Sequence, residues 1–179
     1  MTNLRVLTAA QARAAMDDLC AILSDCVEGG ASVGFMLPIE AETAQAFWQG
    51  VANAVEAGDV VLVAAEYEGK IVGTAQLSLK LPPNQPHRAD VKKLLVHRSA
   101  RGLGLSRLLM TEIEKQAAEA KKSLLVLDTA TGELAERIYE KLGWIKAGVV
   151  PDYALFPDGR FCDTSIFYKR IENASIITA

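Results

Sequence analysis

Residues 91–110 read VKKLLVHRSARGLGLSRLLM. The stretch begins as an apolar strand, passes through a short turn that contains Gly102 and Gly104, and continues as an amphipathic helix. Glycine lets a backbone come close to a ligand, and the first turn of a helix leaves N–H groups unpaired beside a partial positive charge. In this context the turn predicts a site for phosphate groups, although a glycine pair alone would only permit a sharp turn.

Two common phosphate-binding motifs do not fit this stretch. A dinucleotide fingerprint needs G-x-G-x-x-G directly after a strand, and a P-loop needs G-K followed by Ser or Thr. The turn reads RGLGLS instead. It therefore belongs to neither motif.

The chain on both sides of the turn predicts an α+β fold in three layers. A mixed central sheet is expected, antiparallel in its early strands, parallel at its strand–helix–strand centre and flanked by helices. A capping box of Thr8 and Gln11 opens the first helix, and Gly58 ends the second. Strands are expected at residues 4–7, 60–67, 71–80, 90–96, 124–128, 149–150 and 164–170, and helices at 8–27, 42–57, 102–121 and 134–142.

The composition excludes several classes of function. Half of the 179 residues are hydrophobic and 23% are charged, which is typical of one packed domain, expected over residues 1–179 with a frayed tail at 171–179. The net charge of −3 supplies no excess of cations for a nucleic acid or a membrane surface. The only histidines, His87 and His97, stand in no cluster with metal-ligand spacing, so no metal is expected.

The cysteines and the apolar runs indicate a location. The three cysteines form no C-x-x-C pair, and the longest apolar run, residues 60–65, has only the length of a strand. Charges are scattered through the first twenty residues, unlike a signal peptide. We therefore expect a cytoplasmic protein with free thiols.

Two motifs together resemble the GNAT superfamily of acetyl-CoA-dependent N-acetyltransferases. Residues 101–106 fit R-x-x-G-x-S, and residues 135–144 read AERIYEKLGW, similar to the family's [Q/R]-x-x-G-x-[G/A] turn and its FYEKLGF-like helix end. Ser106 departs from the pattern, but it is small enough for a pyrophosphate to fit.

The resemblance implies acetyl-CoA as co-substrate and a V-shaped cleft where two central strands splay apart. Arg101 offers a planar donor fork to phosphate, and the backbone N–H groups of residues 94–96 would hold the acetyl carbonyl and the pantetheine amides. The implied cofactor-binding residues are Leu94, Leu95, Val96, Arg101, Gly102, Leu103, Gly104, Leu105 and Ser106.

Within the superfamily, the chain resembles the tabtoxin-resistance acetyltransferases, which acetylate a β-lactam toxin. The similar stretches are residues 30–36, 75–79, 99–102, 127–129 and 157–160, so the likeness extends over most of the chain. The resemblance implies three catalytic residues, Asp90, Asp128 and Tyr139.

Each of the three has a plainer interpretation beside the catalytic one. Asp90 would act as a base, through water because Asp is shorter than the usual Glu, or it is a solvated acid at a strand end. Asp128 would orient or deprotonate the acceptor, or it caps the helix that follows. Tyr139, with a phenol pKa of about 10, would protonate the leaving sulfur, or it is a core aromatic. Phe47 and Trp48 are expected in the core.

These features predict direct transfer of an acetyl group from acetyl-CoA to an amine or hydroxyl of a small molecule, such as a tabtoxin-like β-lactam or another antibiotic. Acetylation of a protein amine and non-catalytic acyl-CoA binding are the alternatives. Edge strands near the C-terminus leave pairing into a homodimer open.

Overall fold

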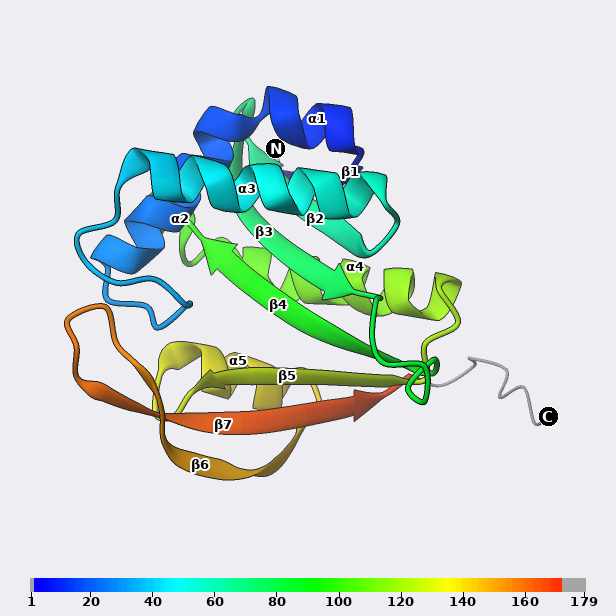
Figure 1. The fold of residues 1–179 in the computed structure, drawn as a ribbon. Helices are drawn as coiled ribbons and strands as arrows, with labels where there is room; N and C mark the ends of the chain where they lie inside the picture. The colour runs from blue at the N-terminus through cyan, green and yellow to red at the C-terminus, as the bar shows by residue number, and fades with distance from the viewer. Residues whose placement is uncertain (1, 172–179) are drawn as a thin grey trace.

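A single seven-stranded sheet organises residues 2–171, which the computed structural model describes (Figure 1). Its spatial order is β1-β2-β3-β4-β5-β7-β6. The strands are β1 Thr2–Leu7, β2 Val60–Tyr67, β3 Lys70–Ser78, β4 Arg88–Val96, β5 Leu124–Ala130, β6 Ile145–Leu155 and β7 Phe161–Arg170. Only the β4–β5 pair is parallel, so the sheet is mixed as predicted.

Helices cover both faces of the sheet. They are α1 Ala9–Ala14, α2 Met16–Glu28, α3 Ala41–Glu56, α4 Leu105–Glu119 and α5 Leu134–Lys141. Figure 1 shows α3 crossing the near face while α4 lies behind β2–β4. Because strand side chains alternate, Leu62 and Ala64 pack toward α1–α3, whereas Val63 and Ala65 pack toward α4. Two apolar cores therefore hold one three-layer fold.

Among the element boundaries that differ from the prediction, three change the local structure. The first helix is broken at Ala15 into α1 and α2, and this bend lets Asp18 Oδ2 accept a hydrogen bond from Ile71 N–H (2.9 Å). Residues 102–104 form a turn before α4, because Gly102 and Gly104 have positive φ. The short strand expected at residues 149–150 is the middle of the eleven-residue β6.

The local signals for turns and caps are confirmed. Thr8 and Gln11 form the predicted capping box, with hydrogen bonds of 2.9 and 3.3 Å between side chain and backbone. Gly58 ends α3 with φ of 75°. Of the tail predicted at 171–179, only Ile171 is described: its N–H donates to Ser123 O (3.0 Å), and residues 172–179 lie outside the described part.

The parallel pair separates shortly after it begins. Residues 88–90 of β4 pair with residues 124–126 of β5, and the ladder stops at Asp90 and Val126. A bulge opposite Ala75 disturbs β4 beyond this point, where Lys93 has φ of 52° and Thr74 Oγ1 donates to Lys93 O (3.2 Å). The splay predicted from the family resemblance is therefore present, and it leaves the β5-facing edge of β4 without a strand partner.

Candidate active site

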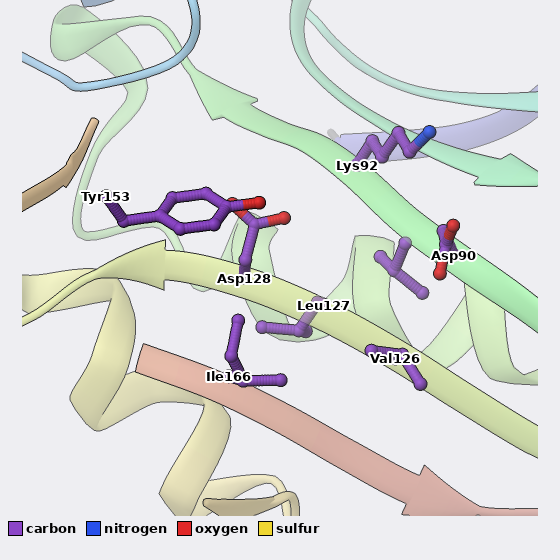
Figure 2. Close-up of a pocket in the computed structure, with 8 residues that line it drawn as sticks. Asp90, Lys92, Val126, Leu127, Asp128, Tyr153 and Ile166 are labelled. Carbon is purple, nitrogen blue, oxygen red and sulfur yellow. The ribbon is translucent and has the colours of Figure 1, made fainter. Parts of the chain in front are cut away.

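A small cavity of about 190 Å³ lies at the point where β4 and β5 separate (Figure 2). Asp90 and Lys92 line it from β4, and Val126 and Asp128 line it from β5. Tyr153 reaches it from β6. The structure thus brings together two of the three predicted catalytic residues, from strands that are distant in sequence.

Asp90 is a partnered carboxylate. Its Oδ1 lies 2.5 Å from Arg88 Nη1, and Arg88 Nε donates in turn to Gln85 Oε1 (2.9 Å). Both charged side chains are partly buried. The ion pair with Arg88 fixes the position of the Asp90 carboxylate, so Asp90 is suited to hold a water or an acceptor.

Asp128 is the freer of the two carboxylates. It is exposed at the carboxyl end of β5, and no ion pair to it exists within the described residues. Figure 2 shows the Tyr153 ring lying beside it. Tyr153 is 58% exposed, so it forms an open wall of the cavity. An unpaired carboxylate at this edge can accept a proton from an incoming ammonium.

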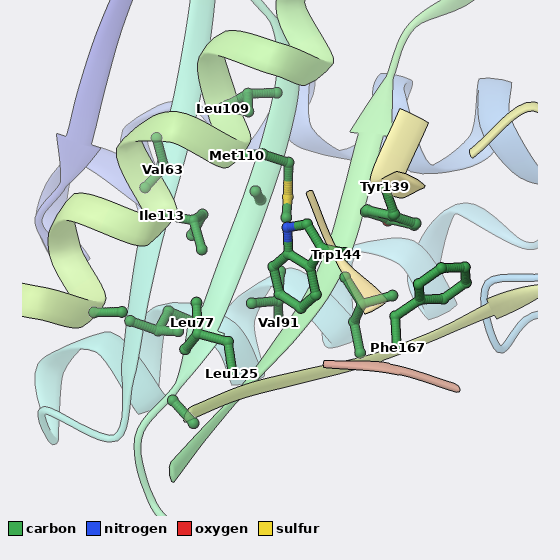
Figure 3. Close-up of a cluster of buried hydrophobic side chains, with 14 of the residues drawn as sticks. Val63, Leu77, Val91, Leu109, Met110, Ile113, Leu125, Tyr139, Trp144 and Phe167 are labelled. Atoms are coloured by element: carbon green, nitrogen blue, oxygen red, sulfur yellow. The ribbon is translucent and has the colours of Figure 1, made fainter. Parts of the chain in front are cut away.

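Tyr139 occupies the apolar core rather than the cavity wall (Figure 3). It is 6% exposed, and its ring lies 6.1 Å from that of Trp144 and 5.9 Å from that of Phe167. Burial, and to a smaller degree the Asp128 carboxylate, raise the pKa of its phenol above the usual range. The phenol therefore stays protonated and senses the charge of Asp128, which is compatible with both interpretations made from the sequence.

The glycine turn has the geometry of an anion site. Gly104 is the left-handed N-cap of α4 (φ 76°), and a Cβ at Gly102 or Gly104 would meet no atom within 4 Å. In the described residues, Arg107 is the first residue after the turn whose N–H reaches a backbone acceptor, Gly104 O (3.1 Å). The N–H groups of residues 102–106 are therefore available to a phosphate.

The residues before the turn provide a second row of backbone groups. Leu94 and Val96 pack toward the α4 core and Leu95 toward α1–α3, so their side chains are occupied by packing. Arg101 Nε donates to Val96 O (3.4 Å), which connects the turn to the end of β4. Backbone N–H groups on the unpaired edge can bind an acyl carbonyl, and these residues fit the pantetheine end of a coenzyme A thioester.

Sequence reasoning did not single out Lys93. Its Nζ donates to Val33 O (2.6 Å) and lies 5.7 Å and 5.6 Å from the ring centroids of Phe35 and Phe47. Burial lowers the pKa of the ammonium, while the Asp128 carboxylate partly opposes this effect. In the sequence Lys93 is one of two consecutive lysines in a strand, and only the bulge turns it inward.

Two loops meet beyond the cavity. Ser32 Oγ donates to Leu155 O (2.7 Å), and Leu37 N–H donates to Pro157 O (3.0 Å). The α2–α3 loop and the β6–β7 loop, which Figure 1 shows side by side, are thereby connected across the open end of the splay. Phe47 adds to this wall by packing on Phe35 at 5.2 Å, while Trp48 is buried in the core as predicted.

A splayed parallel pair, with an anion-binding glycine turn on one side and a carboxylate on the other, defines an acyltransferase fold of the coenzyme A-dependent class. Comparison with known proteins agrees, because the acetyltransferase (GNAT) family matches residues 16–144. The chain belongs to this family, and the fold, the enzyme class and the family predicted from the sequence are confirmed.

Individual relatives support the assignment to this family. An uncharacterized N-acetyltransferase from the hisH-hisA intergenic region of Azospirillum brasilense is 31% identical over 115 residues, which cover 63% of this chain and 67% of the relative. The ribosomal-protein-alanine N-acetyltransferase of Brucella melitensis superposes with a TM-score of 0.77 at 25% identity, covering 94% of this chain and 99% of the other.

A further solved structure has the same fold. A GNAT phosphinothricin acetyltransferase from Sinorhizobium meliloti, crystallised with acetyl-CoA, superposes with a TM-score of 0.75 at 17% identity, covering 95% of this chain and 88% of the other. The prediction of acetyl-CoA as co-substrate agrees with the assignment of the chain to the acetyltransferase (GNAT) family.

Within residues 2–171, no group of three or more His, Cys, Asp or Glu side chains is arranged to hold a metal ion. None of the helices in this part of the chain is long and apolar enough to cross a membrane.

Proposed function

We propose that the protein transfers the acetyl group of acetyl-CoA directly to an amine, or to a hydroxyl, of a small molecule. The observation that carries the proposal is the splay beyond Asp90 and Val126. It leaves backbone donors of β4 and the glycine turn on one side, and the unpaired carboxylate of Asp128 on the other. A thioester and a nucleophile can therefore meet between them.

The proposed roles follow from what surrounds each residue. Asp128 takes a proton from the acceptor ammonium, whose nitrogen then forms a bond to the thioester carbonyl carbon. Asp90, fixed by Arg88, orients the acceptor through water. As the carbon–sulfur bond breaks, the Tyr139 phenol gives its proton to the departing sulfur and coenzyme A leaves as a thiol, while the second proton of the attacking nitrogen returns to the phenolate through water.

The loop contacts favour a small acceptor over a protein. A peptide would need an open groove across the end of the splay, where hydrogen bonds instead connect Ser32 to Leu155 and Leu37 to Pro157. Acetylation of a protein amine remains the second candidate, because the Brucella melitensis relative is named for a ribosomal-protein alanine. Tabtoxin-like β-lactams are the acceptors suggested by the similar stretches, including residues 30–36 and 157–160.

The test is release of coenzyme A thiol from acetyl-CoA in the presence of candidate acceptors. The panel contains tabtoxinine-β-lactam, aminoglycosides, amino acids, simple amines and a peptide with an N-terminal alanine. Turnover with a small amine and not with the peptide supports the proposal. Calorimetric binding of acetyl-CoA without any turnover would instead support a non-catalytic acyl-CoA-binding module.

Two subsidiary proposals concern the setting of the reaction. The free thiols of Cys20, Cys26 and Cys162 favour the reducing cytoplasm. The sheet edge formed by β6, which exposes Val149 and Val150, favours pairing with a second copy. Light scattering of the purified protein measures that association directly.

A further inference from the structure

The acceptor side of the cleft contains hydrogen-bond donors that lack acceptors. Lys93 has three N–H groups, and one of them donates to Val33 O. Within the described residues no carboxylate lies within 4.0 Å of this ammonium. Its other contacts are the faces of Phe35 and Phe47, which offset only part of the free-energy cost of burying a cation, so the ammonium can still bind an anionic group.

A second donor lies close to it in the sheet. Gln76 is 6% exposed, and its Nε2 has no partner among residues 2–171. Gln76 is in register with Lys92, and Ser78 with Asp90, so the Gln76 side chain stands on the face of the sheet that carries Lys92 and Asp90. Lys93 follows Lys92 directly. Two donors in need of an acceptor thus lie on neighbouring strands, next to Lys92 and Asp90, which line the cavity.

The backbone above Lys93 leaves room at this place. Gly34 has φ of 91°, and a Cβ built on it would lie 3.5 Å from Lys93 Nζ, with no other atom within 4 Å. A side chain here would contact the ammonium and cover it. Glycine in the α2–α3 loop therefore keeps one side of the cation uncovered.

We propose that Lys93 and Gln76 bind a carboxylate of the acceptor, so that the substrate is an amino acid or a similar molecule that carries both an amine and a carboxylate. The inference rests on the proposed function, because it names the acceptor class of the same site. The amine lies at Asp128 and the carboxylate at Lys93, and each charge of the substrate meets the opposite charge. The planar carboxylate has enough lone pairs to accept from both donors.

The test compares acceptors that differ only in this group. Wild-type enzyme is assayed for coenzyme A release with the twenty common L-amino acids, their α-amides and the amines left by decarboxylation. We expect free acids to exceed their amides at least ~10-fold in kcat/KM, since a buried charge pair adds that much or more to binding. Equal rates for acids and amides would overturn the inference and leave the proposed function intact.

Two variants assign the preference to these side chains. Lys93→Met keeps the length of the side chain and removes its charge, and Gln76→Glu replaces the amide donor with a repelling carboxylate. Both should lower kcat/KM for free acids by on the order of 30-fold and change the values for amides little. Lys70→Met, which removes an exposed charge at the start of β3, is the matched control and should keep the wild-type ratio.

The ratio of kcat/KM for free acids to kcat/KM for amides distinguishes carboxylate binding by Lys93 from a merely structural role. If Lys93 only anchors the α2–α3 loop, Lys93→Met lowers kcat/KM for free acids and for amides equally, and the inference is wrong. Thermal unfolding supplies a readout that needs no turnover. Free acids should raise the Tm of wild type more than amides do, and this difference should vanish in Lys93→Met. If no amine is acetylated but this difference is seen, the proposed function fails and the carboxylate site stands; no shift from any free acid overturns the site.

Discussion

The glycine turn presents backbone N–H groups from five consecutive residues, 102–106, whereas the acceptor side presents side chains from β3, β4, β5, β6 and a loop. Backbone N–H groups are the same in every protein, so the turn can bind a phosphate wherever its glycines permit the conformation. The side chains of the acceptor side come from five segments, so each of them can be substituted without altering the others. A site built in these two ways can keep its acetyl donor while its acceptor changes, and each side can be disturbed separately.

Asp128→Asn should have the largest effect, and it should be confined to the acceptor side. The variant keeps the shape of the side chain but loses the proton acceptor, so we expect kcat to fall ~10²- to 10⁴-fold with acetyl-CoA affinity unchanged. Steady-state kinetics and calorimetric titration measure the two quantities. Asp90→Asn should lower kcat less, because Arg88 already pairs with Asp90. Asp59→Asn, at a surface pair with Lys80, controls for the loss of a charge. Full kcat in Asp128→Asn would remove the base assignment.

Gly104→Asp should disturb the opposite side. The change puts a carboxylate where phosphate is expected and a side chain where φ is 76°, so acetyl-CoA affinity should fall on the order of 100-fold, about 2.7 kcal/mol.

Gly58→Asp is the matched control, because Gly58 has φ of 75°, equally open surroundings and a position at the end of α3. It carries the same backbone strain without a phosphate nearby, and it should bind acetyl-CoA normally. Equal affinity in the two variants would show that the turn does not hold the phosphates.

Tyr139→Phe tests the core residue whose phenol is proposed to donate to the leaving sulfur. Phenylalanine keeps the core packing against Trp144 and Phe167 and removes only the hydroxyl. If the phenol donates to the leaving sulfur, kcat should fall ~10- to 100-fold while Tm changes little. A core tyrosine with a satisfied hydroxyl would instead lose about 1–3 kcal/mol of stability and keep its turnover. Thermal unfolding and kcat of Tyr139→Phe are measured on the same preparation and compared with wild type.

The donor side was predictable from the sequence because its signals are local. Strand, glycine turn and helix follow one another within residues 91–110, and a glycine with positive φ can be anticipated where a helix begins or ends. The same locality explains why the cap at Thr8 and the end of α3 were predicted correctly.

The acceptor side depends on tertiary contacts that no local pattern reveals. The bulge that turns Lys93 inward arises where β3 and β4 lose register, and the sequence KK gives no sign of it. Likewise, Ala15 is a strong helix former, yet the helix breaks there and Asp18 hydrogen-bonds to β3. Asp90 was predicted as a base acting through water or as a solvated acid, and its ion pair with Arg88 is visible only in three dimensions.

Glu136→Gln should have the smallest effect on turnover, because Glu136 holds α5 against β6 and β7 and lines neither side of the cleft. Its carboxylate accepts from Lys146 Nζ (2.6 Å), Gly132 N–H (2.6 Å) and Ser165 Oγ (2.8 Å), which ties α5 to β6 and β7. These contacts, above all the one from Lys146, lower the pKa of Glu136 from 4.5 to about 2.

A carboxyl whose pKa is lower in the folded state stabilises the fold at pH values above its unfolded pKa, and that contribution disappears as the pH falls toward the folded pKa. We therefore expect Glu136→Gln to reduce the free energy of unfolding by on the order of 1–3 kcal/mol at pH 7, and the difference from wild type to shrink between about pH 4.5 and pH 2. Denaturant unfolding across this range measures it. Glu140→Gln, on the exposed face of the same helix, should show neither effect. Although α5 also carries Tyr139, Glu136 does not line the cavity, so kcat per folded molecule should stay close to wild type at pH 7. A large loss of kcat at unchanged stability would mean that Glu136 acts in the reaction itself. Its contacts with Lys146, Gly132 and Ser165 would then not be purely structural.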